Sequence, residues 1–290
     1  MKLNRQVEIH SWGGLGSQLF AFAFLFDLEK LFPNRTFILV HHTSGETKRF
    51  LDTKFAQSFN VRTRIVDDFE TRSHPSSRNS ISSLVLHIMK NTLKLLLKQL
   101  GVVVYPDSKT KVRVWPWTMQ IRGHYYRREM SHSSLQPIFS YFLKSSSNPK
   151  LSNCLLIHYR HGDLVNIESK LPISVERITS VIENFNSSHE FESIVICSDS
   201  PVNEIPRFEI LLESSRMPRS RFEYRDFSVD ELIRYASGTA FFLGTNSKIS
   251  LWIAILRHSL GHSSTSTYLP REFSSDWTKL GFNLSSIAIY

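Results

Sequence analysis

The sequence predicts an α/β protein made of two units, each with a parallel sheet. Its length of 290 residues suits two domains better than one. Apolar runs of strand length alternate with helical patterns in both halves, and a serine-rich stretch at 145–149 separates them. We therefore expect an N-terminal domain over residues 1–149 and a C-terminal domain over residues 150–290.

In the N-terminal half, the order of the expected elements favours a parallel sheet. These elements are a strand at 7–10, a glycine-rich turn at 13–18, a helix at 19–31 and a second strand at 37–40. Residues 71–83 carry six serines and are typical of an exposed loop. Residues 84–100 have a helical pattern, with lysines at 90, 94 and 98 on one side.

The C-terminal half repeats the alternation of strands and helices, which predicts a second α/β unit. The expected strands lie at 155–158, 193–197 and 239–243, and the expected helices at 173–185, 229–237 and 249–257. Ser228 directly precedes the second of these helices, where a hydroxyl side chain commonly caps the first backbone N–H groups.

Cysteine usage and the lengths of the apolar runs limit the class of protein. Cys154 and Cys197 each lie inside an apolar, strand-like run, where cysteine usually behaves as a small buried hydrophobe. Disulfide and zinc spacings are absent, which favours a reducing compartment. The first expected strand begins near Gln6, so we expect no leader, and no apolar run reaches the roughly 18 residues of a membrane-spanning helix. We expect a cytoplasmic protein.

The net charge of +9 is concentrated in one segment, because residues 71–128 hold eleven Lys and Arg and one acidic residue. Three explanations are open: a solvated helix face, peripheral docking to the anionic inner face of a membrane, or nucleic-acid binding. Residues 84–100 lack interleaved aromatic side chains and no nucleic-acid-binding module is recognisable, so we expect no nucleic-acid partner.

The most informative segment runs from His158 to Asp163 and directly follows the apolar run 155–157. Ligands of open α/β sheets bind just outside the carboxyl ends of strands. Arg160 supplies a permanent, bidentate charge suited to phosphate, and strand alternation puts His158 on the same side. The segment predicts an anion site for a phosphorylated small molecule. The alternative is a surface loop with an Asp cap and a hydrogen-bonded histidine.

Three further segments at strand ends are candidates for the same site. Residues 13–16 can bring backbone N–H groups close to a phosphate, although a plain strand-to-helix turn is the alternative. Residues 244–250 offer hydroxyl and N–H groups at a helix start, or form a capped helix. Asp199 can accept a hydrogen bond from a base or ribose, or cap the next turn.

Missing motifs exclude several chemistries. The glycine-rich segment lacks the Gly-Lys-Ser/Thr of a Walker loop and the third glycine of a dinucleotide fingerprint. The chain has no Gly-x-Ser-x-Gly, no His-Glu-x-x-His and no Asp-x-Asp that would hold a metal against a diphosphate. We therefore expect neither a metal nor a cofactor.

Together these segments resemble glycosyltransferase family 11, the α-1,2-fucosyltransferases, within the α-1,2/α-1,6/protein O-fucosyltransferase superfamily. Residues 13–20 resemble the family's G-x-L-G-N-Q-x-F, with Ser17 in place of Asn, and residues 158–163 resemble H-x-R-R-G-D, with His161 in place of the second Arg. Three more segments resemble family motifs in the same order: 123–127, 198–200 and 246–252. Residues 41–114 and the last thirty or so do not align.

The resemblance implies a GT-B fold, in which two Rossmann-like domains with parallel sheets face a cleft. It implies inverting, metal-independent transfer of L-fucose from a GDP-β-L-fucose donor to a glycan acceptor. A lipid-linked glycan is one alternative for this acceptor. The implied reaction is galactoside α-1,2-fucosylation in surface polysaccharide or O-antigen synthesis, without a cofactor.

The resemblance also implies residue roles. Arg160 would contact the donor pyrophosphate and His158 would position the donor. The other implied donor-binding residues are Gly14, Gly16, Ser17, His161, Asp199, Asn246, Ser247 and Ser250. In the related α-1,6 enzymes a glutamate ten residues after the motif histidine is the proposed base, which corresponds to Glu168 here. Asp163 is the alternative base.

His161 removes a fixed positive charge from the family pattern, and that charge returns only when the imidazole is protonated. Three hypotheses follow. The chain is an active fucosyltransferase, a transferase of the same fold that uses another nucleotide sugar, or a non-catalytic relative that binds nucleotide sugars.

Overall fold

The computed structural model describes residues 6–44, 48–68, 81–106, 112–144, 151–162, 173–186, 191–206, 208 and 221–290. The chain divides into two compact units, Met1–Ile138 and Phe139–Tyr290. The boundary expected at 149/150 lies at the edge of a stretch outside the described residues and stays a prediction.

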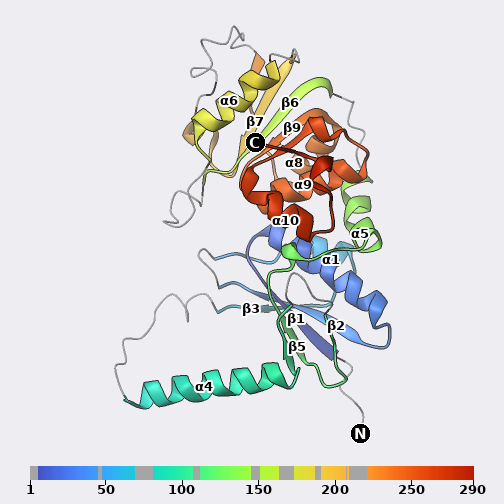
Figure 1. Ribbon diagram of the computed structural model, residues 1–290, viewed down its shortest axis with the longest axis vertical. Coiled ribbons are helices and arrows are strands. Elements are labelled where there is room, and N and C mark those ends of the chain that lie inside the picture. Colours follow the sequence, from blue (N-terminus) through green and yellow to red (C-terminus); the bar gives the residue numbers. More distant parts are fainter. Residues whose placement is uncertain are drawn as a thin grey trace. The chain divides into compact units, whose positions relative to one another are not determined.

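The first unit contains a five-stranded parallel sheet in the order β3-β2-β1-β5-β4 (Figure 1). Its strands are β1 (Gln6–Trp12), β2 (Thr36–His42), β3 (Thr63–Val66), β4 (Val103–Val104) and β5 (Gln120–Arg122). Its helices are α1 (Leu15–Leu31), α2 (Thr53–Ser58), α4 (Ile81–Gln99), the short η1 (Tyr125–Arg127) and the start of α5 (His132–Leu143).

Helix α1 begins earlier than the sequence pattern predicts. The expected turn through residue 18 is wrong, because the helix starts at Leu15 with Gly14 as its N-cap. Gly13 adopts a φ of 93°, which lets the chain leave β1 and enter the helix at once. Most of the helix from Gly16 onward is buried, and packing of its apolar side chains outweighs the low helix propensity of glycine.

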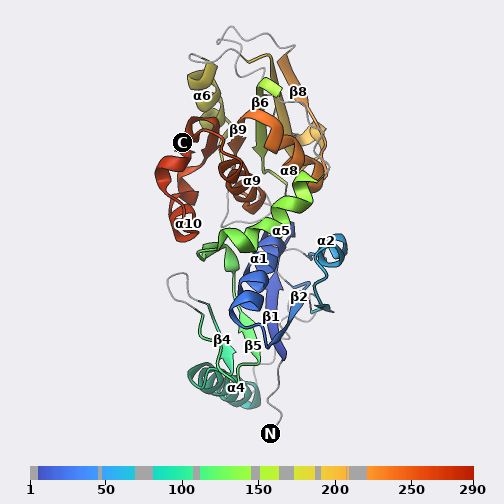
Figure 2. The same cartoon turned by 90° about the vertical axis from the view of Figure 1, so that its right-hand side faces the viewer.

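The second unit contains a six-stranded parallel sheet, of which Figure 2 labels β6, β8 and β9. The strand order is β11-β10-β9-β6-β7-β8. Its strands are β6 (Leu151–Tyr159), β7 (Ser193–Ser198), β8 (Phe222–Tyr224), β9 (Thr239–Gly244), β10 (Thr267–Leu269) and β11 (Ala288–Ile289). Its α-helices are α6 (Val175–Asn186), α8 (Val229–Gly238), α9 (Lys248–Ser259) and α10 (Ser274–Lys279). Short 3-10 helices are η3 (Val202–Glu204), η6 (Ser264–Ser266), η7 (Arg271–Phe273) and η8 (Leu284–Ser286).

The α/β class with a parallel sheet in each half, which the expected GT-B fold requires, is confirmed. Ser228 caps α8 through a complete capping box with Glu231, and both Cys154 and Cys197 are buried free thiols, as expected. The shortest strands, such as β4 and β11, escaped prediction because two residues carry no readable periodicity. The expected cleft concerns how the two units face each other and stays a prediction.

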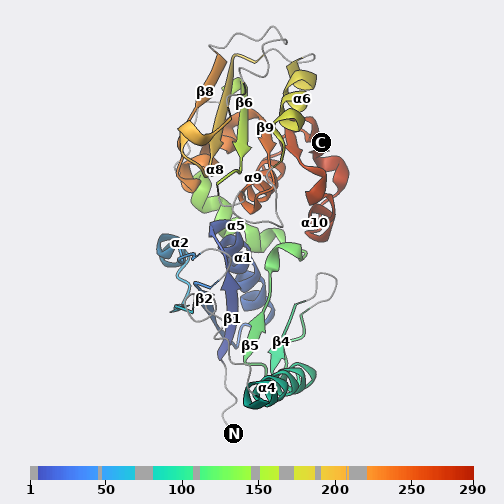
Figure 3. The same ribbon diagram turned by 90° about the vertical axis from the view of Figure 1, so that its left-hand side faces the viewer.

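Helix α4 of the first unit projects from the sheet, with β4 beside its C-terminal end (Figures 1 and 3). The helix predicted at 84–100 is therefore confirmed, whereas parts of the basic segment, 71–80 and 107–111, lie outside the described residues. In the portion of the chain that the structure describes, no helix is long and apolar enough to cross a membrane.

Candidate functional site

The candidate residues of the second unit gather at the carboxyl ends of β6, β7 and β9. Strand β6 lies between β7 and β9 in the sheet. The chain first winds from β6 through β7 to β8 and then returns to the other side of β6 as β9, so β6 and β9 flank the point where the winding direction reverses. Ligands of open parallel sheets bind at such a point, outside the carboxyl ends of the strands.

His158 is held at this point by a buried hydrogen bond. The residue lies opposite Gly244 of β9, and its Nδ1 is 2.8 Å from Ser250 Oγ. Burial, reinforced by the positive charge of Arg160, lowers the pKa of His158 to about 4. The imidazole is therefore neutral at physiological pH. Because Nδ1 is shared with Ser250, Nε2 is the ring nitrogen that can contact a ligand.

Thr245 joins the end of β6 to the loop before α9. It lies in the candidate segment 244–250, but the sequence predicted no role of its own for it. The Thr245 hydroxyl donates to the carbonyl of His158 (2.9 Å) and accepts from the backbone N–H of Arg160 (2.8 Å). The Thr245 side chain is fully buried. Strand β6 ends at Tyr159, so Arg160 is placed by this bond rather than by the strand alternation that we expected.

Asp199 holds the turn that carries the candidate arginine. Its Oδ1 accepts from the backbone N–H groups of His161 (2.9 Å) and Gly162 (3.0 Å). Its Oδ2 lies 3.8 Å from Nε of Arg160. A Cβ on Gly162 would come within 3.1 Å of the Asp199 carbonyl, so the turn is closely packed. The carboxylate thus orders the turn, and its expected role toward a nucleoside stays a prediction.

The N-terminus of α9 lies next to His158. Ser247 is the N-cap, and its hydroxyl accepts from the N–H of Ile249 at 3.2 Å. Gly244 permits the close approach of β9 to the helix, because a Cβ there would lie 2.6 Å from Cβ of Ser250. Asn246, in the loop between Gly244 and Ser247, is partly exposed. The partial positive charge of a helix N-terminus favours an anionic ligand near this loop.

The side chain of His161 packs back on strand β6. Its ring stacks on Tyr159 with centroids 5.8 Å apart and planes at 21°. Its Nδ1 lies 3.4 Å from Ser200 Oγ. The histidine therefore has aromatic and polar neighbours within its own unit.

In the first unit, the predicted glycine-rich residues form the first turn of α1. Ser17 donates its backbone N–H to the carbonyl of Gly14 at 2.9 Å, and Gly16 is buried. A Cβ on Gly14 would meet nothing within 4 Å, so the backbone there is open to a neighbouring group. The buried side chain of Gln18 donates to the carbonyl of Gly13 at 3.1 Å and steadies the entry to the helix.

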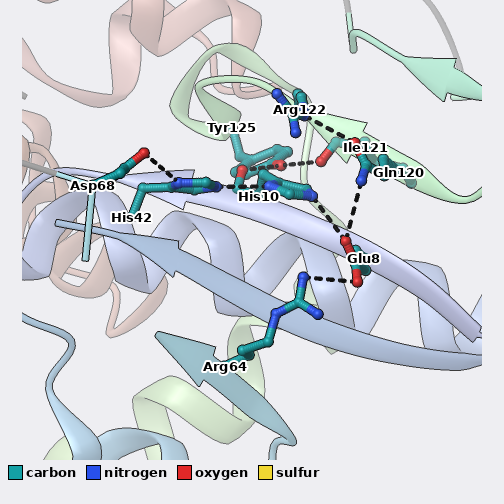
Figure 4. Close-up of polar contacts among 9 residues, drawn as sticks. All are labelled: Glu8, His10, His42, Arg64, Asp68, Gln120, Ile121, Arg122 and Tyr125. Carbon is teal, nitrogen blue, oxygen red and sulfur yellow. Dashed lines mark hydrogen bonds and ion pairs between the residues drawn. The ribbon is translucent and has the colours of Figure 1, made fainter. Parts of the chain in front are cut away.

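A buried chain of polar groups on the first unit's sheet also escaped the sequence analysis (Figure 4). His42 Nδ1 lies 2.9 Å from an oxygen of Asp68, and His42 Nε2 lies 2.7 Å from Nδ1 of His10. His10 Nε2 is 3.2 Å from Glu8, which also pairs with Arg64 at 2.8 Å. The sequence did contain a signal for these groups: Gln6, Glu8 and His10 occupy alternate positions of β1. They therefore share one face of the strand, and Val7 and Ile9 lie on the opposite face.

The number of available protons limits the hydrogen bonds that Glu8, His10, His42 and Asp68 can form with one another. This buried chain contains three contacts between titratable groups, whereas two neutral imidazoles supply only two N–H donors. Burial and the charge of Arg122 lower the pKa of His10 to about 4, so at neutral pH this ring carries no extra proton. If His42 donates from Nδ1 to Asp68 and His10 donates from Nδ1 to His42, the contact between His10 and Glu8 is left without a proton, and this contact is the longest of the three.

The two candidate bases, Glu168 and Asp163, lie in 163–172, outside the described residues. Among the described residues, no group of three or more His, Cys, Asp and Glu side chains is arranged to hold a metal ion. The structure thus brings His158, Arg160, His161, Asp199 and the start of α9 together within the second unit, and the first turn of α1 belongs to the other unit.

Comparison with known proteins gave only distant structural similarity. No family model and no curated protein matches the sequence. The E. coli heptosyltransferase WaaC with ADP is 12% identical, with a TM-score of 0.48 over 98% of this chain and 92% of that chain. A putative UDP-N-acetylglucosamine 2-epimerase from Listeria monocytogenes is 8% identical, with a TM-score of 0.45 over 95% of this chain and 82% of that one.

A glycosyl transferase of family 9 from Veillonella parvula is 13% identical, with a TM-score of 0.41 over 93% of this chain and 81% of that chain. At such identities and scores, the function of this chain has to be argued from its own residues.

Proposed function

We propose that this chain is a glycosyltransferase that binds a nucleotide sugar at the carboxyl ends of β6 and β9 and transfers the sugar to a hydroxyl group. The observation that carries the proposal is the pair of hydrogen bonds made by Thr245, which hold the backbone of Arg160 against the loop before α9. A guanidinium and a helix N-terminus at a sheet's switch point suit a diphosphate.

The finer proposal is that the donor is GDP-β-L-fucose and that the product is an α-1,2-fucosylated galactoside of a surface polysaccharide or O-antigen. Its support is the resemblance of five segments, in order, to α-1,2-fucosyltransferases. Two of these segments supply His158 and Ser250, which are hydrogen-bonded to each other in the folded chain.

In the proposed mechanism, fucosyl transfer is inverting and passes through an oxocarbenium-like transition state. The departing GDP gains negative charge, which Arg160 and the N–H groups at the start of α9 would stabilise without a metal. Neutral His158 would hold the donor through Nε2. Glu168, or Asp163 in its place, would take the proton of the acceptor hydroxyl, as a general base does.

A second candidate is a transferase of the same fold that uses another nucleotide sugar. The position of His161 favours it, because a ring stacked on Tyr159 replaces the second fixed charge of the fucosyltransferase motif. The change lies at a position that the resemblance assigns to the donor site.

Calorimetry with GDP, GDP-fucose and a panel of other nucleotide sugars, followed by assays of donor hydrolysis and transfer, tests the proposal. We expect binding of GDP-fucose and turnover that persists in EDTA. Turnover of a different donor would support the second candidate. Binding without turnover with any acceptor would mean a non-catalytic relative, and strict dependence on a metal would indicate another class of transferase.

A further inference from the structure

Helix α4 exposes a stripe of large apolar side chains. Met89, Leu93, Leu96 and Leu100 are spaced four, three and four residues apart, so they lie along one side of the helix. Their exposed fractions are 64%, 58%, 49% and 63%. Scattered exposed leucines are ordinary on protein surfaces, but a continuous stripe of this kind marks a surface that binds something.

Two exposed tryptophans extend this stripe at its C-terminal end. Trp115 and Trp117 are 43% and 51% exposed and stack on each other with centroids 5.5 Å apart. Trp117 Nε1 donates to the carbonyl of Leu100 at 2.6 Å. Trp115 packs on Gly101, where a Cβ would come within 2.6 Å of its ring. The tryptophans and the helix end therefore form one surface, which we call the α4–Trp surface.

The charge around the α4–Trp surface has a single sign. Helix α4 contains three lysines and no acidic residue. Lys94 and Lys98 lie over the ring of Tyr105, at 5.7 Å and 5.9 Å from its centroid. By helical spacing these lysines lie on the side of α4 away from the apolar stripe, so the helix has one apolar side and one cationic side. An anionic surface is the complementary partner.

We propose that the α4–Trp surface lies in the interface of an anionic lipid bilayer, with the apolar stripe and the tryptophans among the acyl-chain boundary and the lysines at the headgroups. Helices with an apolar face, lysines and no acidic side chains bind membranes in this way. Tryptophan concentrates at the same depth, because its ring is apolar while its N–H seeks a polar neighbour.

One consequence of this proposal rests on the proposed function: a transferase bound to a membrane through the α4–Trp surface would meet a lipid-linked acceptor. Binding to vesicles does not require sugar transfer, so the two proposals fail separately. A chain that binds vesicles but transfers no sugar would leave the surface proposal standing.

Co-sedimentation with vesicles of phosphatidylcholine and phosphatidylglycerol, compared with phosphatidylcholine alone, tests the α4–Trp surface. We expect the full chain to bind the mixed vesicles at low salt, with a blue shift of tryptophan emission. Changing Lys94→Gln and Lys98→Gln together should weaken binding roughly 30-fold, because each lysine near an anionic surface contributes about 1 kcal/mol. Changing Leu93→Gln and Leu96→Gln together should weaken it more than about tenfold.

The matched control removes the same charge elsewhere: Lys54→Gln with Lys144→Gln, two exposed lysines outside α4. This control should bind mixed vesicles as the wild type does. The proposal is overturned by wild-type chain that does not sediment with mixed vesicles, by equal losses in the control, or by leucine variants that change the mass in solution rather than vesicle binding. Circular dichroism establishes that each variant is folded, and because the substituted side chains are exposed we expect unchanged spectra.

Discussion

His158 and Ser250 are separated by 92 residues in the chain, and Nδ1 of the first lies 2.8 Å from Oγ of the second. Both side chains are buried, at 5% and 0% exposure. The bond joins the end of β6 to the first turn of α9, the two elements that would hold the diphosphate. The buried, neutral histidine therefore couples the stability of the second unit to pH.

Stability should fall in mild acid because of His158. The ring stays neutral in the folded chain down to about pH 4, whereas in the unfolded chain it takes up a proton near its ordinary pKa of 6.5. The stabilisation is therefore complete above pH 6.5 and is lost progressively as the pH falls from 6.5 toward 4. Between pH 7 and pH 5 this loss amounts to about 2 kcal/mol.

Urea unfolding at pH 7 and pH 5 measures this effect. The variant His158→Asn is expected to be less stable at pH 7 but to show a smaller difference between the two pH values. The exposed His132→Asn serves as a control and should keep the wild-type difference. Equal pH dependence in His158→Asn and wild type would contradict the assignment.

Removal of the Arg160 guanidinium should impair catalysis more than folding. Arg160→Ala loses the charge that would stabilise the leaving diphosphate, at a cost of about 3 kcal/mol or roughly 10²-fold in rate. Arg160→Lys keeps the charge but not the bidentate geometry and should recover part of the loss. Single-turnover transfer assays and GDP calorimetry measure both, with exposed Arg271→Ala as the control. Full activity of Arg160→Ala would refute the pyrophosphate role.

We expect Gly244 to be required for packing of the second unit, whereas Gly14 is not required for stability. In Gly244→Ala the new Cβ would lie 2.6 Å from Cβ of Ser250 and 2.9 Å from the ring of Phe242, so we expect a destabilisation of about 1–3 kcal/mol. In Gly14→Ala the new Cβ meets nothing within 4 Å, so the chain should keep its stability. Melting temperatures of both variants provide the measurement.

If the backbone at Gly14 approaches the donor, the stable Gly14→Ala variant should bind the donor more weakly than wild type. Unchanged donor affinity would remove Gly14 from the site while leaving the packing argument intact.

Arg257 of α9 is a structural residue, and its loss should destabilise the second unit. The fully buried guanidinium donates to the carbonyls of Ala236 and Thr239 at 2.7 Å each, and to Thr267 Oγ1 at 2.9 Å. Burial lowers its pKa to about 9. Arg257→Met leaves these acceptors without donors, at a cost of about 3–5 kcal/mol. Urea unfolding checks this value, and a loss under about 1 kcal/mol would contradict it.

We predict that Asp68 sets the tautomer of His42. Partial burial raises the pKa of Asp68, but hydrogen bonds from Ser44 and His42 outweigh it, and the net shift is downward. The ionised carboxylate can only accept, so His42 should carry its proton on Nδ1 at neutral pH. Long-range ¹⁵N–¹H NMR of the imidazoles should show this tautomer. Asp68→Asn should shift the His42 signals, whereas Asp67→Asn, the neighbouring carboxylate, should leave them unchanged.

Local patterns predicted much of the site. The apolar run of β6, which is followed by His158 and Arg160, identified a strand end that carries polar chemistry, and the structure places both residues beside the switch point of the sheet. The role of Thr245 escaped prediction because a single threonine between a strand and a helix N-cap has no periodic signal. The buried chain of polar groups from Glu8 to Asp68 also escaped prediction, because its members come from separate segments of the sequence.

The sequence by itself determined the α/β class, most of the longer strands and helices, the cap of α8 and the concentration of positive charge, because each depends on periodicity or on neighbours a few residues apart. Only the tertiary structure decided the order of strands in each sheet, the bond between His158 and Ser250, and the exposure of the α4 leucines. These depend on which distant segments pack together, and that choice is made by burial across the whole unit rather than by any local run of residues.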